Sequence, residues 1–102
     1  MRFLSVIAVV ALLAPIAQPA SADMKDDCAQ NRNPNLRIDG CTAVIRYGDF
    51  SGWNLAISYS NRGNAHYKLG EYRRAIEDYD QTLRIDPGHA NARANRAMAY
   101  NK

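Results

Sequence analysis

Two cysteines are the residues whose chemistry the spacing predicts most directly in this 102-residue chain. Cys28 and Cys41 both follow an apolar N-terminal segment typical of export, and in an oxidising compartment an even pair indicates a disulfide. Twelve residues separate them, whereas catalytic redox pairs typically have a C-x-x-C spacing. We therefore favour a structural bond, worth about 3 kcal/mol on the chain-entropy model, over a free or intermolecular thiol or a redox site.

The two histidines, His66 and His89, lack the spacing of metal ligands. Neither has a second His, Cys or carboxylate at ligand spacing on the same helix face. The chain also shows no nucleophile-base arrangement and no glycine-rich phosphate loop. We therefore expect no enzymatic activity, no metal and no cofactor.

The first 22 residues have the layout of a cleaved secretory signal peptide. Arg2 precedes an apolar run from Phe3 to Ala17, and Ala20-Ser21-Ala22 forms an A-x-A site. This pattern predicts cleavage after Ala22 and a periplasmic or secreted protein. The alternative, an uncleaved membrane anchor, needs about 20 apolar residues, and two prolines interrupt a shorter run.

Charge is spread along the chain. Arg2 is the only charged residue of the segment 1–22, so the remainder keeps 12 of the 13 basic residues against 10 acidic ones. Basic and acidic residues are interleaved, whereas a nucleic-acid footprint would show as a basic cluster. We therefore expect a protein or peptide as partner, no nucleic acid, and no membrane contact after signal cleavage.

Helical periodicity extends from Pro34 to the chain end, and no segment alternates like a strand. Asn33-Pro34 predicts a helix start, Gly48 a left-handed terminator, and Gly70 the end of the second helix. We expect an irregular, disulfide-tethered lead-in over 23–33 and an all-α domain over 34–102. The predicted helices cover approximately 34–47, 53–69, 71–85 and 89–102.

The chain repeats itself at an offset of 34 residues. Such a period indicates a helical repeat array, which offers a binding surface more often than an active site. The recurring residues are Ala56, Asn61, Arg62, Ala65 and Lys68, which return as Ala90, Asn95, Arg96, Ala99 and Lys102.

Within this period, residues 56–89 resemble the tetratricopeptide repeat. The resemblance implies antiparallel helical hairpins stacked as a short α-solenoid, of an exported bacterial type. It implies one complete repeat at 56–89, flanked by half repeats at 35–55 and 90–102. The residues at the family's signature positions are Tyr59, Gly63, Ala75, Tyr79 and Pro87.

The resemblance also implies a concave binding face lined by the first helix of each repeat. Asn64 and Asn95 match two positions that hold a peptide's terminal carboxylate in some relatives. Ser60 stands where those relatives have lysine, so an ordinary polar groove is the favoured alternative. The candidate binding residues are Ser60, Asn61, Asn64, Tyr67, Lys68, Asn95 and Met98.

Two departures from the family pattern suggest further interpretations. Arg62 and Arg96 replace a consensus leucine; we expect Arg62 to pair with a carboxylate such as Asp78 or Glu77, and a row of arginines for an acidic ligand is the alternative. The segment 89–102 has no following helix to cover it. The alternative function is therefore an assembly piece, or a truncated repeat fragment, that self-associates through this helix.

Overall fold

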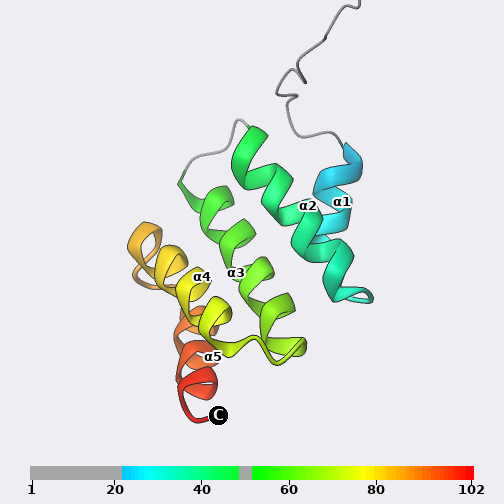
Figure 1. Ribbon diagram of the computed structural model, residues 1–102. Coiled ribbons are helices and arrows are strands. Elements are labelled where there is room, and N and C mark those ends of the chain that lie inside the picture. The colour runs from blue at the N-terminus through cyan, green and yellow to red at the C-terminus, as the bar shows by residue number, and fades with distance from the viewer. Residues whose placement is uncertain (1–21, 49–51) are drawn as a thin grey trace, which may run out of the picture.

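The computed structural model describes residues 22–48 and 52–102, which contain five helices and no strand (Figure 1). The all-α fold predicted from periodicity is confirmed. The predicted signal peptide, apart from Ala22, and residues 49–51 lie outside the described residues. The helices are α1 (Ala22–Ala29), α2 (Pro34–Tyr47), α3 (Trp53–Lys68), α4 (Tyr72–Ile85) and α5 (Ala90–Tyr100).

Consecutive helices pack as antiparallel hairpins (Figure 1). Each helix contacts the next along the chain, and α3 additionally contacts both α1 and α5. Helices α1, α3 and α5 therefore share one side of a short α-solenoid, while α2 and α4 form the other. This arrangement confirms the predicted stacking of helical hairpins.

The segment predicted as an irregular lead-in contains helix α1, so that prediction is wrong for Asp23 to Ala29. The segment lacks an apolar stripe, and its conformation depends on packing against α2. A Cβ atom on Gly40 would lie 2.5 Å from Asp27 Cβ, so only glycine permits this close approach. Cys28 joins Cys41 through the predicted disulfide, with their Cα atoms 4.4 Å apart. Helix α1 lies one 34-residue period before residues 56–63, the middle of α3.

The two ends of α2 show how sequence signals succeed and fail. Asn33 caps the helix as predicted, because its side chain accepts a hydrogen bond of 3.0 Å from the Leu36 amide. Gly48 does not terminate it in the left-handed region; its φ of −75° and ψ of 152° are extended. The chain leaves α2 directly in an extended direction, with the Gly48 amide bonded to the Val44 carbonyl.

The turn between α3 and α4 has the predicted glycine terminator. Gly70 has a φ of +77°, a conformation that glycine adopts without a Cβ penalty. Its amide donates to the Tyr67 carbonyl at 3.0 Å, and the Glu71 amide donates to the His66 carbonyl at 2.9 Å. This Schellman motif satisfies carbonyls that the end of α3 would otherwise leave unpaired.

Small residues let α3 and α4 approach closely. A Cβ atom on Gly63 would lie 2.8 Å from Cε1 of Tyr79, and Ala75 is fully buried beside that ring. Among the other signature residues, Tyr59 is half-buried and Pro87 lies in the exposed turn between α4 and α5. This hairpin forms the framework on which the polar side chains of α3 are held.

Candidate functional site

A pocket of about 250 Å³ opens on the side of the solenoid shared by α3 and α5. We call it the polar pocket. Its wall carries two cationic side chains, three amide side chains and two tyrosines, and no carboxylate. The lining residues are Asn31, Arg37, Asn64, Tyr67, Lys68, Tyr79 and Asn95.

Asn64 lies at the centre of the wall with a fixed amide orientation. Its Oδ1 accepts hydrogen bonds from the Tyr79 hydroxyl at 2.7 Å and from Asn95 Nδ2 at 3.0 Å. Burial raises the pKa of Tyr79, so its hydroxyl stays protonated and remains the donor. Because both bonds use the carbonyl oxygen, the amide N–H groups of Asn64 are left to donate to a ligand.

Arg37 is a buried cation on this wall, with only 9 % of its surface exposed. Its Nε donates to the Cys28 carbonyl at 3.0 Å. Among the described residues, no Asp or Glu forms an ion pair with it. Burial lowers the pKa of Arg37 from its ordinary value, although an arginine remains charged in proteins. A desolvated cation without a counterion is costly unless an anion joins it.

Lys68 adds a second positive charge at the exposed rim of the polar pocket. Its Nζ donates to the Asn31 carbonyl at 3.1 Å, which connects the end of α3 to the segment after α1. The neighbouring Tyr67 ring meets Tyr72 edge-on, with centroids 5.2 Å apart. Lys102 Nζ lies 5.8 Å from the Tyr67 centroid, within reach of a cation–π interaction.

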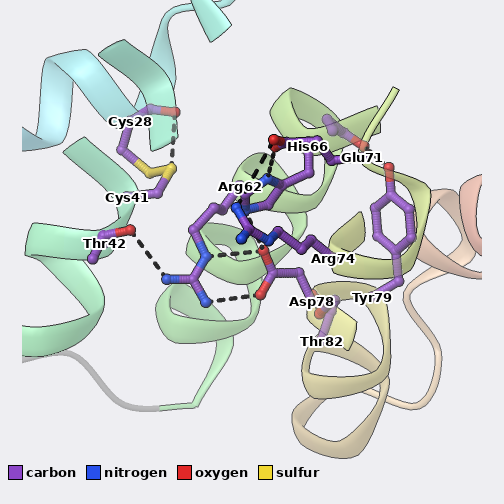
Figure 2. Close-up of polar contacts among 11 residues, drawn as sticks. Cys28, Cys41, Thr42, Arg62, His66, Glu71, Arg74, Asp78, Tyr79 and Thr82 are labelled. Atoms are coloured by element: carbon purple, nitrogen blue, oxygen red, sulfur yellow. Dashed lines mark hydrogen bonds and ion pairs between the residues drawn. A yellow bond between two sulfur atoms is a disulfide. The ribbon is translucent and has the colours of Figure 1, made fainter. Parts of the chain in front are cut away.

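A second group of charges lies between α2, α3 and α4 and is paired (Figure 2). Arg62 donates to both carboxylate oxygens of Asp78, at 2.9 and 2.8 Å, and to the Thr42 hydroxyl at 3.1 Å. This bond to Asp78 raises the pKa of Arg62. His66 contacts Glu71 at 2.7 Å and Asp78 at 3.8 Å. The pairing predicted for Arg62 with Asp78 is present, so this group holds the helices together.

The structure brings four of the predicted binding residues together and separates the other three. Ser60 is buried, and Asn61 lies in a neighbouring pocket, where its Nδ2 donates to the Cys28 carbonyl. Met98 is 51 % exposed on α5 and does not line the polar pocket. The four residues that meet in the polar pocket are Asn64, Tyr67, Lys68 and Asn95.

Sequence reasoning did not place Arg37, Asn31 or Tyr79 in a binding site, although all three line the polar pocket. The spacing contained a signal for Arg37, because it precedes Cys41 and Val44 by four and seven residues on the buried face of α2. A charge on a buried helix face indicates either a partner or a site. Asn31 could not be recognised, because its place depends on helix α1.

The described residues contain no group of three or more metal-ligating side chains. Within the same residues, no helix is long and apolar enough to cross a bilayer. The amide, hydroxyl and cationic side chains of the polar pocket can form hydrogen bonds and charge contacts.

Stacked helical hairpins with a pocket along their shared side define a helical-repeat binding protein. Residues 56–89 match the tetratricopeptide repeat family, so this part of the chain is a tetratricopeptide repeat. This repeat is a protein-interaction module.

Curated relatives match part of the chain. Sperm-associated antigen 1 of Mus musculus is 42% identical over 59 residues, which cover 57% of this chain and 6% of the relative. RNA polymerase II-associated protein 3 of Rattus norvegicus is 43% identical over 52 residues, covering 51% of this chain and 8% of the relative. The chain thus spans less than a tenth of the length of these relatives. No solved structure matches the chain significantly.

Proposed function

We propose that the chain is a non-catalytic module that binds an acidic segment of a partner protein in the polar pocket. The observation that carries the proposal is Arg37, a buried cation that has no carboxylate partner among the described residues. Lys68 contributes a second charge, and the fixed amides of Asn64 and Asn95 add directional contacts. A carboxylate of the partner would supply the counterion that Arg37 lacks.

A displayed library of random nonapeptides, selected on the full oxidised chain, tests this proposal. We expect enriched peptides to contain Asp or Glu, and replacement of that residue by Asn or Gln to weaken binding about tenfold. Binding should also weaken as salt is raised, because part of the attraction is between exposed charges.

Variants then locate the contact. Lys68→Met changes an exposed side chain and should weaken binding of the enriched peptide. Arg37→Met should weaken the same binding. Arg73→Met removes an exposed arginine outside the polar pocket and serves as the matched control. Enrichment of peptides without acidic residues, or equal affinity of Lys68→Met and Arg73→Met, would overturn the proposal.

We propose in addition that the chain is exported and cleaved after Ala22. The A-x-A site and the disulfide between Cys28 and Cys41 support this, because disulfides persist in oxidising compartments. Expression in a secreting bacterial host should give a protein whose first residue is Asp23, by N-terminal sequencing. Ala22→Tyr should block cleavage. A chain that keeps Met1 and sediments with membranes would contradict the proposal.

A second candidate function is self-association through α5, either of a complete assembly piece or of a truncated repeat fragment. It is favoured by Met98 and Tyr100, which are 51 % and 65 % exposed. Light scattering should then show a mass that rises with concentration and falls for Met98→Glu with Tyr100→Glu. A constant monomer mass would exclude this candidate.

A further inference from the structure

A second pocket of about 210 Å³ lies between α1, α2 and α3, and most of its lining residues precede the matched repeat at 56–89. We call it the apolar pocket, because most of its surface is carbon. Its lining residues are Lys25, Cys28, Ala29, Val44, Asn54, Ile57, Ser58 and Asn61.

Two of the polar side chains on this wall have protein acceptors. Ser58 donates its hydroxyl to the Asn54 carbonyl at 3.1 Å, and Asn61 donates its amide to the Cys28 carbonyl at 3.3 Å. The apolar part of the wall comes largely from Cys28, Ala29, Val44 and Ile57. Such a surface gains free energy by burying an apolar group.

The Cys28 carbonyl is the boundary between the two pockets. It accepts hydrogen bonds from Arg37, which lines the polar pocket, and from Asn61, which lines the apolar pocket. Cys41 Sγ lies 3.5 Å from the same oxygen, a van der Waals contact because a disulfide sulfur has no hydrogen to donate (Figure 2). Along α3, the nearest lining residues of the two pockets, Asn61 and Asn64, are about one helical turn apart, so the pockets meet at their edges.

We infer that the apolar pocket takes an apolar side chain of the same segment that the polar pocket binds; this inference rests on the proposed function. In an extended peptide, residues two apart point to the same side and are separated by about 6.6 Å. The chain therefore recognises an acidic residue and an apolar residue with one residue between them.

Helix α1 and the disulfide make this second pocket possible. Three of its lining residues belong to α1, and the apolar contact of α1 with α2 is confined to Met24, Cys28, Cys41 and Val44. The disulfide between Cys28 and Cys41 holds α1, which forms part of the pocket wall, against α2. The interaction surface thus extends beyond residues 56–89 onto a helix that the repeat pattern did not predict.

The nonapeptide selection on the full oxidised chain tests the spacing. We expect enriched peptides to carry Leu, Ile, Met or Phe two positions from Asp or Glu. In the best enriched peptide, replacing the apolar residue by Ser should weaken binding about tenfold.

A pocket-filling variant identifies where the apolar residue binds. Ala29 is exposed and lines the apolar pocket, so Ala29→Trp should fill it. The apolar-to-Ser change in the peptide should then have less than about a twofold effect. Ala90→Trp, at an exposed alanine of α5 outside both pockets, is the matched control and should retain the tenfold effect.

The outcomes separate the two claims. Acid-dependent binding without an apolar preference at this spacing would overturn the inference and leave the polar pocket standing. An apolar effect that persists unchanged in Ala29→Trp would also overturn it. Peptides that bind without acidic residues, or no enrichment, would overturn the proposed function and the inference together.

Discussion

Two arginines on neighbouring helices, Arg37 on α2 and Arg62 on α3, show opposite treatments of a buried positive charge. Arg62 lies between α2, α3 and α4 and is neutralised by a bidentate carboxylate of Asp78. Arg37 lies on α2 and is more completely buried, yet it has only the neutral Cys28 carbonyl as a hydrogen-bond acceptor in the described part of the chain.

The comparison separates framework from site. A charge whose partners lie within the fold stabilises that fold, and its removal leaves the partner uncompensated. A buried charge without a counterion gives the fold little, and the proposed function accounts for Arg37 as a charge kept for a ligand. The four variants below change stability by decreasing amounts and test this distinction.

Arg62→Met should have the largest effect, a loss of about 3 to 5 kcal/mol in the free energy of unfolding. The change would leave Asp78, which is 5 % exposed, without its two charged donors. Urea denaturation of the oxidised protein measures this.

Arg96→Met is the matched control for Arg62→Met, because Arg96 lies one 34-residue period later and pairs with the more exposed Asp80 at 2.7 Å. Its loss should be below about 1 kcal/mol. Equal losses for the two variants would contradict the role assigned to the paired group.

Removal of the disulfide by Cys28→Ala with Cys41→Ala should cost about 3 kcal/mol. The variant also distinguishes the surroundings of the two arginines. The acceptor of Arg37 is the Cys28 carbonyl on α1, whereas the partners of Arg62 lie on α2 and α4. Hydrogen exchange should show lost protection in α1 and retained protection in α3 and α4. Reduced wild-type protein should behave like the double variant; uniform loss of protection would contradict this local role.

Sequence periodicity was sufficient for the framework. The spacing of apolar residues predicted α2 to α5, and the residue types at the helix ends predicted the Asn33 cap and the Gly70 terminator. For Arg62 the sequence predicted a carboxylate partner, Asp78 or Glu77, and the structure shows Asp78. Each of these features depends on neighbours in one helix or one hairpin. These are local signals. The 34-residue repeat strengthens the helix prediction, because residues of one predicted helix recur in a later one.

The candidate site was only partly predictable. Asn64 and Lys68 follow from the repeat position, but Arg37 and Asn31 reach the polar pocket from a different hairpin and from the segment after α1. Helix α1 has few apolar residues and depends on Gly40 and the disulfide for its packing. Its helical conformation is therefore a tertiary effect that local propensity does not contain.

Glu71→Ala should lower the free energy of unfolding by about 1 kcal/mol, less than removal of the disulfide does. It removes the 2.7 Å contact with His66 at the edge of the paired group. Glu71 makes no side-chain capping bond to α4, and its contact with the exposed Arg74 is long at 3.9 Å. Glu77→Ala, at an exposed position of the same helix, is the control and should change stability by less than about 0.5 kcal/mol. Identical results would exclude Glu71 from the group.

Of the four variants that are not controls, Arg37→Met should have the smallest effect on stability, within about 1 kcal/mol of wild type. The lost hydrogen bond to the Cys28 carbonyl is offset because an uncompensated buried cation becomes a buried apolar side chain. The same variant should lose acidic-peptide binding by about tenfold or more. A stability loss as large as that of Arg62→Met would mean that Arg37 belongs to the framework, and the distinction between the two arginines would fail. A stable protein that no longer binds would show that the fold maintains this charge for its ligand.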